Sequence, residues 1–308
     1  MKRPTRSRVS PFSVPAASAL VAASLLGAPL GAEPQEPGLT VGVDWLAAHL
    51  DDVVLLHVGS DSSFAEGHIP GAVFVARDRM SHPGSHSPDA LILELPEADA
   101  FQEALRAWGV NDDSRVVVTF GADEWVTPTA RLVFTLDWAG LGDRTSYLDG
   151  GAVAWTAAGH ALTGEAAAPA RGNVTIHPRD IVVDAEWVQA HQMTGGYRLV
   201  DARSPAFFDG VREDRGVAGH IPGAGNVHWN TLVDEETLLL KPLPELRSLF
   251  EAAGVEDGDT VVGYCHIGQY ATLMLLSARL LGHDVVLYDG AFQDWATRGL
   301  PAETAKGR

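Results

Sequence analysis

The strongest constraint on the fold is an internal repeat that runs through most of the chain. The hexapeptide Gly-His-Ile-Pro-Gly-Ala occurs at 67–72 and again at 219–224. Other shared landmarks accompany the two copies in the same order, namely an apolar run, a Gly-Val pair, a second valine-rich run and an Asp-Gly turn that leads to a tryptophan. Repetition of this kind is typical of a tandem duplication. We therefore expect two domains with the same fold, which suits a chain of 308 residues.

Each repeat has the pattern of alternating strands and helices. Short runs of β-branched and other apolar residues are typical of strands that are buried on both faces. Amphipathic stretches lie between them, at 96–108, 128–138, 242–253 and 270–281. This alternation predicts an α/β fold in which each domain has a parallel sheet with helices on both faces. We place domain 1 at 39–162 and domain 2 at 179–303, joined by an Ala-, Pro- and Gly-rich linker at 163–178.

The first 32 residues have the pattern of a secretory signal peptide. Four basic residues lie before Val9, an apolar stretch follows from Val14 to Leu30, and Gly31-Ala32 precedes a polar segment. The stretch is short for a membrane span and contains prolines, which argues against an uncleaved anchor. We expect cleavage after Ala32 and an exported protein, periplasmic or secreted, with no membrane attachment in its mature form.

Charge and residue types exclude several classes of function. The net charge of −18 disfavours a nucleic-acid partner, because an acidic surface repels phosphate backbones. The single cysteine excludes an internal disulfide and paired-cysteine metal sites. His82, His86 and Asp89 lie in a Pro- and Gly-containing stretch, which does not supply the fixed geometry of a metal site. We expect no metal and no organic cofactor.

The chemistry is concentrated at the one cysteine, Cys265. A buried strand is predicted to end at Tyr264 and a helix to begin near Gln269, so Cys265 lies at the carboxyl end of a parallel strand, where α/β sheets bind ligands. The intervening loop, in which Gly268 permits unusual dihedrals, can direct N–H groups inward and form an anion pocket with the helix start. We expect the thiol to ionise more readily than a free cysteine. The alternative is an inert, buried cysteine.

Other repeated residues are expected to be structural. His68 and His220 occur in both copies of the hexapeptide, although only one repeat has a thiol. This symmetry favours a role in fixing the turn. Trp155 and Trp295 also recur and are expected to pack in the core or between the domains. The repeated Asp-Gly turns before these tryptophans are typical of turns rather than of nucleotide-binding loops.

The duplicated unit, the two hexapeptide turns and the loop Cys265–Tyr270 resemble the rhodanese family of sulfurtransferases, in particular the two-domain thiosulfate and 3-mercaptopyruvate sulfurtransferases. The resemblance covers about 39–301 and implies two tandem rhodanese-like domains. It also implies that Cys265 is the catalytic residue, which accepts a sulfane sulfur and holds it as a persulfide wrapped by the loop's N–H groups. The substrate-binding candidates in this loop are His266, Ile267, Gly268, Gln269 and Tyr270.

Domain 1 departs from this pattern. Alignment of the two valine-rich runs puts Phe120 opposite Cys265, and the loop that follows it contains Asp123 and Glu124 but no thiol. Such a loop cannot form a persulfide and disfavours an anion. His57 also stands where domain 2 has Asp201. We expect domain 1 to be catalytically silent and to form one wall of the cleft.

Basic residues for an anionic donor are scarce in domain 2. Phe207 stands where the family often has an anion-binding arginine, and the loop after Cys265 has none. Arg203 is the nearest match to the family's Asp-x-Arg pattern and is our candidate substrate-binding arginine. The alternative is a structural arginine paired with a carboxylate. Arg212 and Arg215 are further candidates.

These features predict an enzyme that moves a sulfane sulfur from thiosulfate, or from a similar donor, to cyanide or a thiol acceptor through a Cys265 persulfide. 3-Mercaptopyruvate is a further candidate donor. The partners are small molecules, and a protein sulfur acceptor stays open. One alternative is a non-catalytic sulfur carrier or redox sensor that acts on a protein partner. A phosphatase built on the same loop is disfavoured, because its loop would be longer and closed by an arginine. The donor, the acceptor and the oligomeric state are left open by the sequence.

Overall fold

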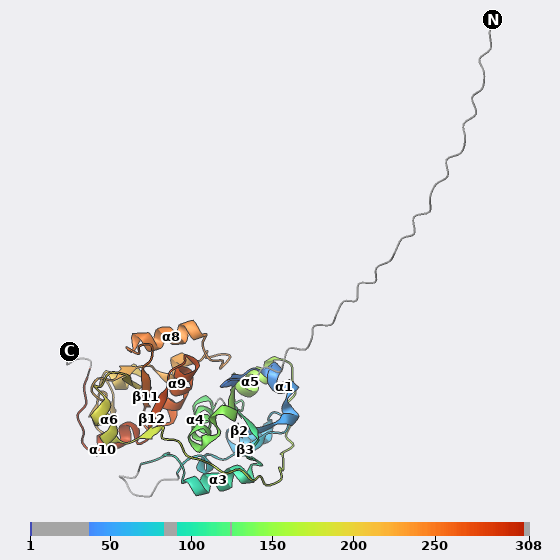
Figure 1. The fold of residues 1–308 in the computed structure, drawn as a ribbon, viewed down its shortest axis with the longest axis horizontal. Helices are drawn as coiled ribbons and strands as arrows, with labels where there is room; N and C mark the ends of the chain where they lie inside the picture. The colour runs from blue at the N-terminus through green and yellow to red at the C-terminus, as the bar shows by residue number, and fades with distance from the viewer. Residues whose placement is uncertain (2–36, 83–90, 124, 305–308) are drawn as a thin grey trace. The chain divides into compact units, whose positions relative to one another are not determined.

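The computed structural model describes residues 1, 37–82, 91–123 and 125–304 (Figure 1). The expected signal peptide, apart from Met1, lies outside the described residues, as do His86, Asp89 and Glu124. Among the helices of the described part, none has the length and apolar character that crossing a membrane requires.

The first repeat forms a five-stranded parallel sheet whose central strand is β4. In spatial order the strands are β1 (Thr40–Val41), β5 (Thr145–Leu148), β4 (Arg115–Phe120), β2 (Val53–Val58) and β3 (Val73–Val75). The pairing between β2 and β4 is the most extensive and sets Val53 opposite Arg115 and Val58 opposite Phe120.

The second repeat forms a sheet with the same strand order, which confirms the predicted duplication of one α/β fold. Its parallel strands are β6 (Val182–Val183), β12 (Val285–Tyr288), β11 (Thr260–Tyr264), β7 (Tyr197–Asp201) and β10 (Gly225–Asn226). Each strand therefore has a counterpart at the same position in the first sheet. The second repeat alone adds an antiparallel hairpin, β8 (Glu213–Asp214) and β9 (Val217–Ala218).

Helices connect the strands in both repeats. Those of the first repeat are α1 (Val43–Ala48), α2 (Asp61–Glu66), α3 (Ala98–Ala107), α4 (Val126–Leu136) and α5 (Gly151–Ala157). Those of the second are α6 (Ala185–His191), α7 (Pro205–Phe208), α8 (Leu243–Ala252), α9 (Gln269–Leu280) and α10 (Ala291–Thr297). Shorter helical turns are η1 (Leu50–Asp52), η2 (Arg77–Arg79), η3 (Asp137–Leu141), η4 (Gly142–Arg144) and η5 (Trp229–Leu232).

Both faces of each sheet are buried, as the unbroken apolar runs predict. In β2, Leu56 packs in one hydrophobic cluster and its neighbour Leu55 in another on the opposite face. In β11, Val261 and Val262 are divided between two clusters in the same way. Successive side chains of a strand point to opposite faces, so this division means that apolar layers cover both sides.

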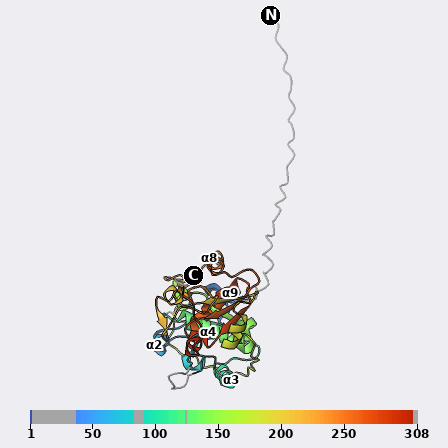
Figure 2. The same cartoon turned by 90° about the vertical axis from the view of Figure 1, so that its left-hand side faces the viewer.

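The two repeats share one core. Helices α4 and α9, which follow the equivalent strands β4 and β11, pack against each other and lie side by side in both views (Figures 1 and 2). The largest cluster contains Leu132 of α4 together with Leu273 of α9, so apolar packing is continuous from one repeat to the other. Contacts accordingly group the chain from Pro37 onward into a single unit.

The aspartate of each Asp-Gly turn accepts a hydrogen bond from the other repeat. Asp149 accepts a hydrogen bond from the N–H of Leu240 at 2.8 Å through Oδ1. Asp289 accepts one from the N–H of Leu95 at 2.6 Å through Oδ2. Leu95 and Leu240 precede the equivalent helices α3 and α8, so the same contact is made in both directions.

The repeated histidines hold the hexapeptide turns. His68 stacks on Phe64 with ring centroids 3.6 Å apart, and its Nδ1–H donates to the Phe64 carbonyl at 2.7 Å. His220 stacks on Phe208 at 3.7 Å and donates to the Phe208 carbonyl at 2.7 Å. The contacts are equivalent in the two repeats, and they confirm the structural role expected from the symmetry.

Candidate active site

Cys265 lies directly after β11, the central strand of the second sheet, and is fully buried. The loop that begins at Cys265 is held by the start of α10. The N–H of Phe292 donates to the Cys265 carbonyl at 2.9 Å, and the N–H of Gln293 donates to the His266 carbonyl at 3.0 Å. The carboxyl end of a central parallel strand is the usual place for ligands in α/β sheets, and the loop is fixed there from two sides.

The backbone N–H groups of Ile267, Tyr270 and Ala271 favour the thiolate form of Cys265 and act to lower its pKa. Burial is the largest influence on Cys265 and raises its pKa, and the three N–H groups oppose that shift without reversing it. The expectation that the free thiol ionises more readily than an ordinary cysteine is therefore wrong. The sequence predicts the N–H cradle, but it does not show that the sulfur is completely removed from water, which penalises the thiolate.

Gly268 allows the loop to close. Its φ is +83°, a left-handed conformation that favours glycine. A Cβ at this position would lie 3.0 Å from the Asp289 carbonyl oxygen and 3.1 Å from Nη1 of Arg131. The loop thus packs directly against the Asp-Gly turn of its own repeat and against α4 of the other repeat.

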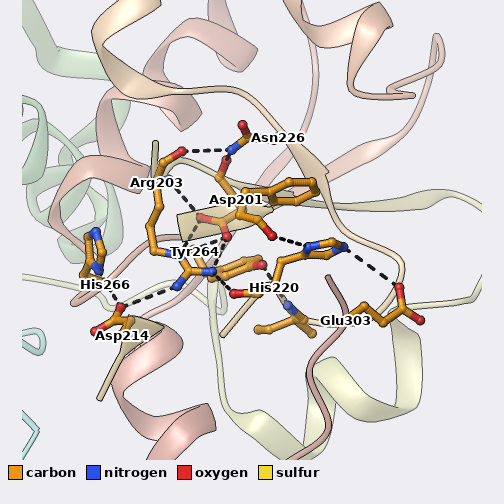
Figure 3. A network of polar contacts seen from close by, with 11 residues as sticks. Asp201, Arg203, Asp214, His220, Asn226, Tyr264, His266 and Glu303 are labelled. Atoms are coloured by element: carbon orange, nitrogen blue, oxygen red, sulfur yellow. Dashed lines mark hydrogen bonds and ion pairs between the residues drawn. The ribbon is translucent and has the colours of Figure 1, made fainter. Parts of the chain in front are cut away.

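His266, on the rim of the loop, is oriented by the β8–β9 hairpin. Its Nδ1 lies 2.5 Å from Oδ2 of Asp214 (Figure 3). Its ring packs edge-on against Phe207 with centroids 4.6 Å apart. Burial alone would raise the pKa of Asp214, but its hydrogen bond to His266 and the neighbouring positive charges hold that pKa below its ordinary value. Asp214 is not among the residues that the sequence singles out; it precedes Arg215-Gly216, which form the two-residue turn of this hairpin with both residues at positive φ.

Arg203, the predicted substrate-binding arginine, is fully buried. Its Nη2 lies 2.7 Å from Oδ2 of Asp201 and donates to the Gly219 carbonyl at 2.8 Å, and its Nη1 lies 3.5 Å from Oδ2 of Asp214 (Figure 3). The guanidinium also lies over the Phe292 ring at 3.8 Å. These contacts favour the structural alternative, in which Arg203 ties the hexapeptide turn and the hairpin to the end of β7.

The other loop candidates lie in different surroundings. Ile267 lines a cavity of about 400 Å³. Gln269 is buried and donates from Nε2 to Oγ1 of Thr127 in α4 at 3.3 Å. Tyr270 stacks on Trp229 with ring centroids 5.1 Å apart.

Arg212 and Arg215 both have partners inside the second repeat. The guanidinium of Arg212 lies 4.7 Å above the Phe207 ring. Arg215 donates from Nη2 to Oε1 of Gln293 at 3.2 Å. Phe207 therefore has a cation on its face and His266 at its edge.

The equivalent place in the first repeat is occupied by an apolar ring and a polar cluster. Phe120, aligned with Cys265, is buried at the end of β4. Beyond it, Oδ2 of Asp123 accepts from the N–H of Ser60 at 2.8 Å. Both ring nitrogens of His57 are buried without a hydrogen-bond partner in the described part of the chain, and burial lowers its pKa to about 4. This arrangement offers neither a thiol nor a positive cradle.

A metal centre is not evident in the described residues, which contain no group of three or more His, Cys, Asp or Glu side chains suited to hold an ion. Of the stretch with His82, His86 and Asp89, the last two residues lie outside the described part.

The Rhodanese-like domain family matches this chain twice, at residues 42–158 and 184–298, so the chain belongs to the rhodanese family. Both repeats are included, and the second match contains Cys265. The fold and the site thus define a tandem rhodanese protein, and its relatives place it among the sulfurtransferases.

Two relatives are similar over most of their lengths. The chain is 34% identical over 286 residues to the 3-mercaptopyruvate sulfurtransferase of Escherichia coli K12, covering 86% of this chain and 98% of the relative. It is 33% identical over 247 residues to SseB of Mycobacterium tuberculosis, whose name places it with the thiosulfate sulfurtransferases, covering 77% and 82%.

Solved structures agree with this placement. The crystal structure of SseA from Escherichia coli, a 3-mercaptopyruvate enzyme, matches with a TM-score of 0.71 and 30% identity, covering 83% of this chain and 99% of that one. The anaerobic ergothioneine biosynthesis enzyme of Chlorobium limicola matches with a TM-score of 0.74 and 20% identity, covering 86% and 70%. The second likeness is one of fold alone.

Proposed function

We propose that this sulfurtransferase works by double displacement at Cys265, with a persulfide as the intermediate. The observation that carries the proposal is the position of the Cys265 sulfur, at the carboxyl end of the central strand and within reach of three N–H donors. Sulfur transfer needs one nucleophile and a cradle for negative charge, and both are present here.

In the first step the Cys265 thiolate attacks the outer sulfur of a donor such as thiosulfate. A sulfur–sulfur bond forms to Cys265, the bond within the donor breaks, and its electron pair leaves with sulfite. The N–H groups of Ile267, Tyr270 and Ala271 stabilise the charge on the sulfur that remains. Because burial disfavours the thiolate, we propose that proton loss from Cys265 is coupled to donor binding.

In the second step an acceptor nucleophile attacks the outer sulfur of the persulfide. Cyanide, for example, forms a carbon–sulfur bond and leaves as thiocyanate, and the electron pair of the broken sulfur–sulfur bond returns to Cys265 as a thiolate. The fully buried sulfur favours acceptors that are small or that present an extended thiol. The alternative is a sulfur carrier whose acceptor is a protein, and the experiment below distinguishes it from an enzyme with small acceptors.

We propose further that the protein is exported and acts on small molecules without a nucleic-acid or membrane partner. The support is the basic and then apolar pattern of residues 1–32 and the net charge of −18. Mass spectrometry of the mature protein from a fractionated host tests this, with a new N-terminus after Ala32 as the expected result.

The test of the proposed function compares the mature wild type with Cys265→Ser in thiocyanate formation from thiosulfate or 3-mercaptopyruvate and cyanide. Intact mass is recorded after each donor is added alone. We expect turnover only in the wild type, with a cyanide-removable gain of about 32 Da. A mass gain without turnover would indicate that the sulfur acceptor is a protein. If neither a mass gain nor thiocyanate is found with either donor, the proposal is overturned.

A further inference from the structure

The cations next to the Cys265 loop in the second repeat already have partners, whereas sulfur donors are anions. Arg203 is paired with Asp201, Arg215 with Gln293, and Arg212 lies on Phe207. Arg131, which reaches the loop from α4, is 2.7 Å from Asp289. Carboxylates therefore already balance the charges of Arg203 and Arg131, but the first repeat has a further cation that reaches the loop and has no ion pair among the described residues.

Arg77 of the first repeat is placed to supply that charge. It begins η2, directly after the edge strand β3, and is exposed. Its Nη2 donates to Oε1 of Gln269 at 3.0 Å, and Gln269 in turn donates to Thr127. This chain of bonds holds the guanidinium against the first residue of α9, at the end of the Cys265 loop.

The remaining donors of Arg77 are available. Within the described part of the chain, its Nε and Nη1 take part in no hydrogen bond and its guanidinium in no ion pair. The guanidinium carbon is 6.0 Å from the centre of the Trp125 ring, a weak contact that does not use those N–H groups. Since Nη2 has two N–H groups, the guanidinium edge that does not face Gln269 keeps two donors, one of them from Nη2, and such an edge suits a carboxylate.

Arg77 lines the same cavity of about 400 Å³ that Ile267 of the Cys265 loop lines. Of the described residues, Ile92 and Leu93 add to the apolar part of the lining, and Arg77, Asp78, Ser81 and His82 to the polar part. The backbone of Ile92 is held by the side chain of Gln293, whose own N–H holds the His266 carbonyl, so this wall and the loop are fixed to each other.

The composition of this cavity distinguishes between donors. Its volume and its apolar side suit an organic molecule rather than a bare inorganic ion. Asp78 beside Arg77 disfavours a compact dianion, whereas a donor with a single carboxylate at one end can meet Arg77 and keep its uncharged part against Ile92 and Leu93.

We propose that Arg77 binds the carboxylate of an organic sulfur donor of the mercapto-acid class, and that the first repeat thereby determines donor specificity for the thiol of the second. The inference rests on the proposed function, because it assumes that a donor approaches Cys265. Arg77 does not touch the transferred sulfur in this arrangement; it holds the far end of the donor.

The experiment compares Arg77→Ala and Arg77→Lys with Arg79→Ala, a matched variant in the same exposed turn that does not line the cavity. With 3-mercaptopyruvate as donor, we expect Arg77→Ala to raise KM roughly 10-fold to 100-fold with kcat within about threefold, as for loss of a charge-assisted hydrogen bond. Arg77→Lys should recover part of the loss. Arg79→Ala should match the wild type, as should the KM for thiosulfate in every variant.

A second readout does not need turnover. In a Cys265→Ser background, calorimetric titration with pyruvate, which has the same carboxylate and no sulfur, should show weaker binding when Arg77→Ala is added and unchanged binding with Arg79→Ala. An unchanged KM and unchanged pyruvate binding would overturn the role of Arg77. An equal rise in KM for thiosulfate would overturn the selection of organic donors. A wild type that is inactive while pyruvate binding still depends on Arg77 would instead contradict the proposed function.

Discussion

Arg131 of α4 and Asp289, directly after β12, form a buried ion pair between the two repeats, with Nη2 of the arginine 2.7 Å from Oδ1 of the aspartate. The same Nη2 donates to the Leu93 carbonyl at 2.8 Å, and the other oxygen of Asp289 accepts from the N–H of Leu95. The pair therefore joins α4, the segment before α3 and the turn against which Gly268 packs. It fixes the position of the cavity wall relative to the Cys265 loop.

We predict that Arg131→Met lowers the free energy of unfolding by about 3–5 kcal/mol, because it leaves the buried Asp289 carboxylate without its cation. Urea denaturation of the full chain measures this. The control is Arg247→Met, whose ion pair with Asp257 is exposed and should contribute less than about 1 kcal/mol. Equal effects of the two substitutions would contradict the structural role of the buried pair.

Gly268→Ala should abolish most of the turnover, because the added Cβ would have to displace the Asp289 carbonyl and the Arg131 guanidinium. A displacement of the loop by 1 Å is sufficient for a loss of roughly 100-fold. Gly282→Ala is the matched control, since Gly282 also has a positive φ, +93°, but has open space around its Cβ position. Both variants should lose about 1–2 kcal/mol of stability through backbone strain, and only the first should lose activity. Similar kcat/KM values in both would show that the loop tolerates a side chain.

The rate of alkylation of the free enzyme should keep rising with pH beyond the point at which an ordinary thiol has ionised, near pH 8.5. Burial raises the pKa of Cys265, and the thiolate is the reactive form. The raised pKa also makes stability depend on pH. The folded protein keeps the thiol proton to a higher pH than the unfolded chain does, so the stability that the protonated thiol contributes is lost as the pH rises through the pKa of the folded state. Iodoacetamide kinetics from pH 6 to 10 measure the profile, and a plateau below neutral pH would contradict it.

His57→Leu should change the pH dependence of stability without changing sulfur transfer. The pKa of His57 is lowered from 6.5 to about 4 by burial, so the unfolded chain takes up a proton more readily than the folded one. The wild type should therefore lose stability relative to the variant as the pH falls from about 6.5 to about 4. Urea midpoints at pH 7, 5.5 and 4.5 test this. Parallel curves would show that His57 is not buried neutral, and a loss of turnover would show that the first repeat is not silent at this position.

The order of strands and helices, the duplication and the position of Cys265 could be predicted because each leaves a local signal in the sequence. The helices at 96–108 and 270–281, for example, are α3 and α9 with their ends moved by one or two residues. Arg77, Arg131 and Asp214 could not be predicted as parts of the site, because each reaches it through a contact with a distant segment. The direction of the Cys265 pKa shift was missed for the same reason, since complete burial depends on how the surrounding elements pack.

The reciprocal contacts of Asp149 with Leu240 and of Asp289 with Leu95 have the form of a two-fold interface between identical subunits. In a homodimer the two copies have the same sequence, so each copy would have to supply both the reactive thiol and the residues that pack against the thiol loop of its partner. Fusion into one chain removes that requirement. One copy has kept Cys265, and the other has a phenylalanine at the equivalent position and directs Arg77 and Arg131 toward its neighbour's loop. The covalent duplication thus allows the two sides of a reciprocal interface to carry different residues while the contacts between them are kept.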